Sequence, residues 1–133
     1  MKYIKIHSIL LICFFLGSIS TSGQQPNISE KLTTALKQGD AHALSDLFAP
    51  YIMIHIQDFQ KVVNAQQARM QLSDFFKQHP SSGLTLTKSE NEENQEYFIW
   101  NYISGNEKWR VYVLLKSEKG QKLIQQIDIE KTP

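Results

Sequence analysis

The side chains best suited to chemistry in this sequence are scattered, and none falls into a catalytic or metal-binding pattern. His55 lies in a stretch of alternating polar and apolar residues, and no second titratable group is spaced to assist it in proton transfer. His42 and His79 stand at the ends of predicted helices, and no pair of histidines has the spacing of metal ligands. Neither a Ser-His-Asp arrangement nor a glycine-rich phosphate loop can be drawn. We therefore assign no catalytic residue, no metal ligand and no cofactor.

Six aromatic side chains gather in residues 97–116, YFIWNYISGNEKWRVYVLLK. Gly105 can take the first central position of a two-residue turn, which would place Tyr102 opposite Trp109 and Trp100 opposite Val111 on one face. Aromatic side chains on a small sheet usually fill the core. The sharper hypothesis is that some of them line a ligand cavity. The candidate cavity-lining residues are Trp100, Tyr102, Trp109, Phe76 and Ile56.

The opposite face of this hairpin is polar near the turn and apolar farther away. Arg110 would lie opposite Asn101 beside the turn, where an arginine could clamp a carboxylate but is more often structural or interfacial. An antiparallel sheet that is apolar on both faces needs a partner, and a homodimer through the sheet is the simplest one. The candidate interface residues are Tyr97, Ile99, Arg110 and Tyr112, with Leu114 beside them.

Residues 1–23 have the pattern of a secretory signal peptide. A basic start precedes the apolar run 8–19 and a short stretch of small and polar residues, and this run is too short to span a bilayer comfortably. After cleavage, residues 24–133 would form a single domain in the bacterial periplasm or outside the cell, with no transmembrane segment. The only cysteine, Cys13, would leave with the signal peptide, so disulfides and thiol catalysis are not expected.

The charge balance gives no reason to expect a nucleic acid or an anionic membrane as partner. The chain has 14 basic and 13 acidic residues, and loss of Lys2 and Lys5 with the signal peptide leaves twelve basic residues. The remaining basic residues are spread along the chain and form no run that could follow a phosphate backbone.

The mature segment reads as helices followed by strands, which predicts an α+β domain. Asn27 is placed to cap a helix that Gly39 ends, and Asp40 begins a short second helix that we expect to run, with Phe48 on its inner face, until Pro50. The two helices should form a hairpin.

Alternating isoleucines in residues 51–57 predict a half-buried strand, and a short strand at 61–63 should follow it. Asn64 is placed to cap a third helix that ends at His79, before Pro80. The remaining strands should be separated by polar turns at 90–95 and 117–121. We expect a curved antiparallel sheet packed against three helices.

Several segments resemble a known family. They are ALKQGDAHALSDLF, VNAQQARMQLSDFFKQHP, WRVYVLLK and LIQQIDIEK, and they are similar to small exported bacterial domains grouped as domain of unknown function 4783. That family belongs to the nuclear transport factor 2-like, or cystatin-like, cone fold, which also contains ketosteroid isomerase and the SnoaL-type cyclases. The resemblance covers nearly all of residues 24–133. It implies a conical cavity between helices and sheet, and it implies no activity.

The same resemblance indicates where a catalytic base would lie. In isomerase-type members a carboxylate on the first hairpin removes a proton beside a carbonyl, and that position falls near Ile56, which cannot accept a proton. Asp58 would have to replace it, with Tyr51 or Tyr102 as hydrogen-bond donor.

Three interpretations follow. The leading one is a noncatalytic exported domain that binds a small apolar molecule or a protein partner, as a homodimer. The second is a SnoaL-like enzyme that acts on a small carbonyl or polyketide-like compound. The third is a structural envelope protein whose cavity is closed.

Overall fold

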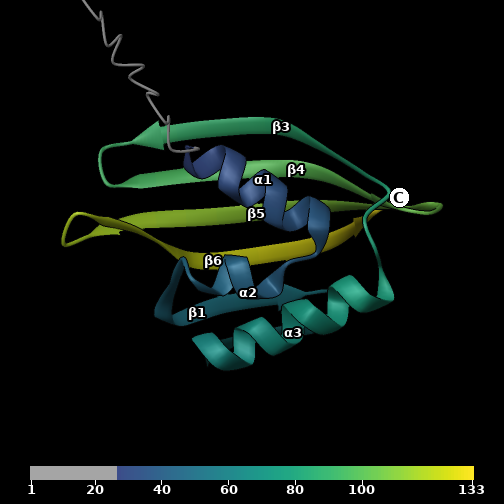
Figure 1. The fold of residues 1–133 in the computed structure, drawn as a ribbon, viewed down its shortest axis with the longest axis horizontal. Coiled ribbons are helices and arrows are strands. Elements are labelled where there is room, and N and C mark those ends of the chain that lie inside the picture. The colour runs from purple at the N-terminus through teal and green to yellow at the C-terminus, as the bar shows by residue number, and fades with distance from the viewer. Residues whose placement is uncertain (1–26) are drawn as a thin grey trace, which may run out of the picture.

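Three helices cover one face of a six-stranded sheet in the computed structural model of the protein, which describes residues 27–133 (Figure 1). The helices are α1 (Ile28–Gln38), α2 (Ala41–Ser45) and α3 (Ala65–Gln78). The strands are β1 (Phe48–Ile56), β2 (Phe59–Asn64), β3 (Gly83–Glu92), β4 (Gln95–Ser104), β5 (Glu107–Glu118) and β6 (Gln121–Thr132). The predicted order of elements is confirmed, whereas the predicted signal peptide lies outside the described residues.

Each helix begins at the cap that the sequence indicated. The side chain of Asn27 accepts a hydrogen bond from Glu30 N at 2.8 Å, and that of Asn64 accepts one from Gln67 N at 2.8 Å. These contacts satisfy backbone N–H groups that have no partner within the helix. Gly39 ends α1 in the left-handed conformation, with φ of 65°.

The second helix is shorter than predicted. It ends at Ser45, and Phe48 and Pro50, which we expected to be helical or helix-terminating, lie in β1. The amide of Ile124 donates to the carbonyl of Leu47 at 2.7 Å, so the chain begins to pair with β6 directly after the helix. Pro50 is tolerated because the register of β1 against β6 shifts between residues 48 and 53, and an irregular stretch does not need every N–H.

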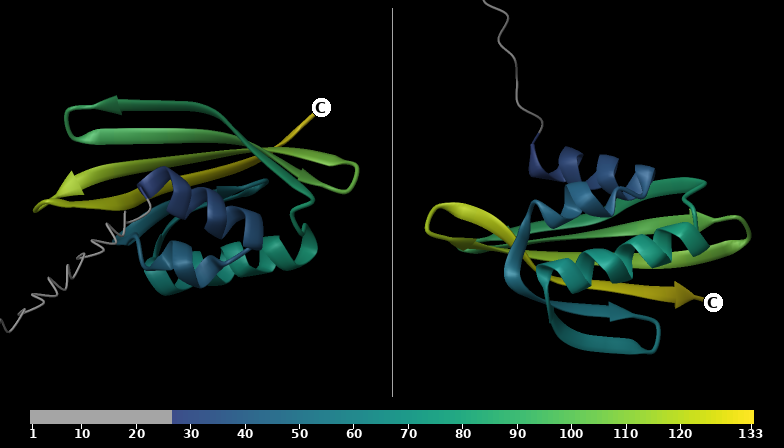
Figure 2. Two further views of the ribbon diagram at one scale, coloured as in Figure 1. Left: turned by 45° about the horizontal axis from the view of Figure 1, so that its top comes forward. Right: turned by 60° about the horizontal axis from the view of Figure 1, so that its bottom comes forward.

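The sheet order is β2-β1-β6-β5-β4-β3, and β1 pairs with β6 in parallel, which corrects the expectation of a wholly antiparallel sheet. The other neighbouring strands are antiparallel. Helix α3 carries the chain from β2 at one edge to β3 at the other, and the meander from β3 returns β6 to the side of β1 (Figures 1 and 2). The parallel pair is therefore a consequence of the long connection.

Two expected polar turns are mostly strand. Between β3 and β4 only residues 93–94 lie outside the strands, and between β5 and β6 only Lys119 and Gly120 do. Both of these last residues have positive φ, 49° and 78°, which suits a tight hairpin turn. The prediction of longer turns was wrong because these strand ends are polar and exposed, whereas apolar alternation identifies only half-buried strands.

The core lies between the helices and the inner face of the sheet, the face that the helices cover (Figure 2). Its largest fully buried side chains include Trp100, Trp109, Tyr102 and Phe98 from the sheet. From the helices, Leu32 and Leu72 meet them with no exposed surface, so the apolar stripes of the helices are buried against the sheet. Within residues 27–133, none of the helices is long and apolar enough to cross a membrane.

Candidate functional site

The β4–β5 hairpin has the predicted register. Tyr102 pairs with Trp109 and Trp100 with Val111, and Gly105 takes a positive φ of 57° in the turn. The side chains of Trp100, Tyr102 and Trp109 are at most 1% exposed. The inner face of the hairpin is therefore dry, as its pairing indicated.

Aromatic rings from α3 occupy the space above this end of the sheet. The ring of Phe75 meets that of Trp109 edge to face at 5.0 Å between centroids, and it lies 5.7 Å from that of Tyr102. Phe76, also buried, lies 6.3 Å from Tyr102. These centroid separations are those of packed aromatic pairs, so side chains fill the volume between the rings.

Two of the three polar tips in this cluster are engaged within the protein. Trp100 Nε1 donates to Thr33 Oγ1 at 3.0 Å, and the Tyr102 hydroxyl donates to the carbonyl of His79. Burial raises the pKa of Tyr102 to about 12. Trp109 Nε1 is buried and has no hydrogen-bond partner within the part of the chain that the structure describes. Neither engaged group is free to bind a ligand in this arrangement.

His79 is a member of this cluster that the sequence did not indicate. Its ring contacts both that of Phe75, at 5.0 Å between centroids, and that of Trp109, at 4.8 Å, and its Nδ1 is 3.4 Å from Glu107 Oε1. In the sequence, the position of His79 between α3 and Pro80 indicated only that a helix ends there. It did not indicate which side chains His79 would contact. The fold of α3 over the hairpin brings these groups together.

The residues proposed for the enzyme alternative do not converge on the interior. A hollow of about 240 Å³ between the β1–β2 turn and α3 is lined by Ile56, Asp58 and His79 among others, and Asp58 itself is exposed. Tyr51 is 69% exposed and points to the opposite face from the buried Ile52, so its expected role as a donor inside the cavity is wrong. Tyr102 is already bonded to a backbone carbonyl.

The outer face of the sheet carries the apolar band that the sequence predicted on β4 and β5. Its members are half-buried, and the rings of Tyr97 and Tyr112 lie 5.7 Å apart between centroids with their planes tilted by 36°. The band consists of Tyr97, Ile99, Tyr112 and Leu114. Arg110, the polar member of the predicted interface, is exposed and pairs in register with Glu130. None of the three helices in residues 27–133 covers this face (Figure 2).

The outer apolar surface extends farther than predicted. Leu114 pairs with Gln126, which pairs with Met53, which pairs with Val62, so one row of outward side chains crosses from β5 to β2. Val62 is 60% exposed and Tyr51 beside it 69%. Residues Gln126 and Asp128, joined by hydrogen bonds of 2.9 and 3.1 Å, divide this surface into two apolar parts.

The tyrosines of the band and the charged side chains beside it shift one another's pKa values. Burial, aided by the nearby carboxylate of Asp128, raises the pKa of Tyr112. A hydrogen bond with Tyr97 is the main cause that raises the pKa of Lys88 and lowers that of Glu90, and these two side chains pair at 3.4 Å. Both signs of charge therefore border the band.

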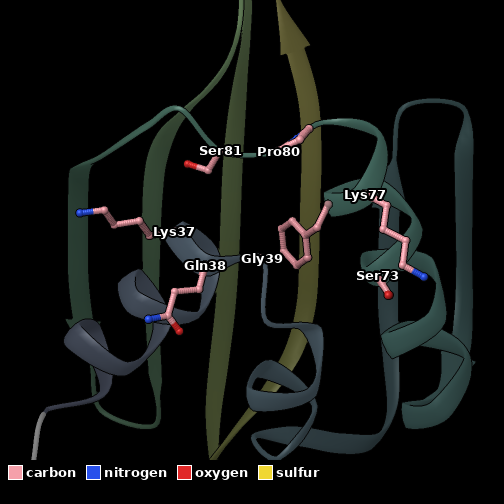
Figure 3. A pocket seen from close by; sticks show the side chains of 8 residues that line it. Lys37, Gln38, Gly39, Ser73, Lys77, Pro80 and Ser81 are labelled. Atoms are coloured by element: carbon pink, nitrogen blue, oxygen red, sulfur yellow. The ribbon is translucent and has the colours of Figure 1, made fainter.

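A second hollow, of about 260 Å³, lies where the ends of α1 and α3 meet (Figure 3). Lys37, Ser73, Lys77 and Ser81 are among its lining residues, which would suit an anion if the two ammonium groups converged. Figure 3 shows instead that the two lysine side chains extend to opposite sides. Residues 27–133 also contain no group of three or more His, Cys, Asp or Glu side chains placed to hold a metal ion.

This architecture, three helices on a curved sheet, is that of the nuclear transport factor 2-like class. An NTF-2-like protein of unknown function from Silicibacter pomeroyi matches with a TM-score of 0.56 and 10% identity over 78% of this chain and 89% of that one, which shows the shared fold. A family model for the domain of unknown function DUF4783 matches residues 29–130, and the chain belongs to that family.

Solved structures of DUF4783 family proteins agree with this assignment. The protein from Bacteroides ovatus is 26% identical, with a TM-score of 0.75 over 84% of this chain and 99% of that one. The protein from Bacteroides uniformis is 20% identical, with a TM-score of 0.76 over 80% and 99% of the two chains. No curated protein matches this chain.

Proposed function

We propose that this protein is an exported, noncatalytic binding domain that forms a homodimer through the outer face of its sheet. The observation that carries the proposal is the outer apolar surface, which extends from Tyr97 on β4 to Val62 on β2 and is interrupted on β6 by Gln126 and Asp128. No element of residues 27–133 lies above it (Figure 2). Exposed apolar surface of this extent commonly marks a protein interface. The signal-peptide pattern of residues 1–23 supports export to the periplasm or beyond.

A second copy of the chain is the simplest occupant because the surface is self-compatible. Lys88 and Arg110 border the apolar band together with Asp128 and Glu130, so two such faces need not repel each other. Two-fold dimers bury the same patch on both subunits and are the commonest homo-oligomers.

A noncatalytic role is supported by the inner face. Tyr102 and Trp100, which carry polar groups inside the core, bond to His79 and Thr33. Asp58, the acid that an isomerase-like reaction would need, is exposed at a turn. General acid–base chemistry requires a titratable group within hydrogen-bond reach of a bound substrate, and these side chains do not provide one in the core.

Native mass spectrometry of the exported, processed protein tests the dimer. We expect a dimer at micromolar concentration, and we expect I99E and Y112E to give monomers, because each buries an unpaired charge in the interface. The matched control is Q66E, which adds the same charge on the exposed side of α3. A wild-type protein that is monomeric, or I99E and Y112E proteins that remain dimeric, would refute the proposal.

A further inference from the structure

A groove of about 400 Å³ runs between α1 and α2 on the helix side of the molecule. Only Gly39 and Asp40 connect the two helices, so α1 and α2 lie close together (Figure 1). Of its lining residues, Ala35 is buried and Ala43 and Leu47 are half-buried, and we take these three apolar side chains as its floor. Small side chains at the contact leave this space open, whereas bulkier ones would fill it.

The rim of the groove is acidic. Glu30, Asp40 and Asp46 line it together with one cation, Lys31, so negative charge exceeds positive charge by two. Asp40 Oδ1 accepts a hydrogen bond from Ala43 N at 3.0 Å, which fixes this carboxylate at the end of the groove. The floor therefore offers hydrocarbon contact and the rim offers carboxylates.

We propose that this groove binds a small apolar molecule that carries one cationic head, such as an alkylammonium or an aromatic amine. Hydrocarbon placed on the alanine and leucine floor leaves water, and the ammonium group meets the carboxylates at the rim. The same rim disfavours a carboxylate of equal length. The larger volume and the more apolar floor favour this groove over the hollow beside Asp58.

The site is independent of the proposed dimer. The groove lies among the helices, and the candidate dimer surface lies on the face of the sheet opposite to α1, α2 and α3 (Figure 2). A dimer can therefore exist without a ligand, and a ligand can bind a monomer. Mass spectrometry measures dimer formation, and the titration described next measures ligand binding.

The test compares three probes with the same six-carbon alkyl chain: hexylammonium, 1-hexanol and heptanoate. Each is titrated into the isotope-labelled, processed protein, and amide shifts are followed by two-dimensional NMR. We expect saturable shifts that centre on Thr34, Ala35 and Ala43, with hexylammonium binding about fivefold more tightly than 1-hexanol, as for a partly exposed ion pair. Heptanoate should bind more weakly than the alcohol.

Two kinds of variant separate shape from charge. A43L fills the floor and T34L, at an exposed position, narrows the groove, so both should abolish saturable binding while circular dichroism shows a folded protein. D46N should reduce the preference for the ammonium to about twofold. The controls are Q66L and D74N on exposed positions of α3, which should change neither quantity.

The inference is overturned by any of three results. The first is equal affinity for the three probes, which would mean that the rim does not select charge. The second is unchanged binding by A43L and T34L. The third is a set of shifts that centres on the β1–β2 turn, which would place binding at the hollow beside Asp58.

Discussion

At the scale of single residues, the hydrogen bond from Trp100 to Thr33 shows how a buried polar atom fixes a helix to the sheet. The indole nitrogen donates to Oγ1 at 3.0 Å, and Trp100 has no exposed surface. We expect T33V to lower the free energy of unfolding by about 1 to 3 kcal/mol, because valine has a similar shape but leaves the nitrogen without an acceptor. Urea unfolding measures the loss.

Two further substitutions control this experiment. T33S keeps the hydroxyl and should retain most of the stability, whereas T34V at the exposed neighbouring position should change it by less than about 0.5 kcal/mol. If T33V and T33S were equally stable, the hydrogen bond would not be the cause.

The buried phenol of Tyr102 predicts a dependence on pH. Burial raises its pKa to about 12, so the unfolded chain, with an ordinary tyrosine pKa of about 10, loses the proton first. The stabilisation that the neutral Tyr102 side chain gives to the folded state is fully present below about pH 10 and is lost as the pH rises towards 12. We expect the free energy of unfolding of Y102F to fall less steeply over this interval in urea titrations at several pH values. Equal slopes for the two proteins would contradict the assignment; Tyr112, whose pKa is also raised, accounts for part of the remaining slope.

At the scale of elements, the junction between α1 and α2 depends on a glycine. Gly39 has φ of 65°, and a Cβ atom there would lie 3.2 Å from Phe76 Cβ. Gly120 also has positive φ, but a Cβ atom added there would have no neighbour within 4 Å. We expect G120A to cost about 1 kcal/mol of unfolding free energy from the backbone alone, and G39A to cost about 2 kcal/mol, because it also crowds a buried ring. Equal losses in chemical denaturation would show that Phe76 moves freely.

Element types were more predictable than element ends. The caps at Asn27 and Asn64 are local signals, because a side chain bonds to an amide three residues on, and both are confirmed. The end of α2 was wrong because it is set by pairing between Leu47 and Ile124, residues far apart in the sequence. The ends of the strands beside the β3–β4 and β5–β6 turns were predicted as turns, because strand pairing and not burial stabilises these polar residues.

At the scale of the whole molecule, the sheet separates two surfaces. Its inner face joins the helices in a core of packed rings, and its outer face presents two apolar parts, separated by Gln126 and Asp128, together with charges of both signs. The proposed dimer belongs to the outer face and the proposed amine groove to the helix layer. A variant that disrupts one should leave the other intact, which native mass spectrometry and NMR titration can each verify.

We could predict from local sequence patterns the class of fold, the order of its elements, the register of the aromatic hairpin and which of the hairpin's faces is dry. Those features follow from local caps, from turn geometry and from a side-chain period of two residues. Three other features could not be predicted in this way: β1 lies parallel to β6, Phe75 and His79 pack on Trp109, and Tyr51 faces outward. These depend on how α3 crosses the sheet and on strand pairing over long sequence distances. Because such contacts join residues that no local pattern relates, the groove between α1 and α2 also became visible only once the helices were in place.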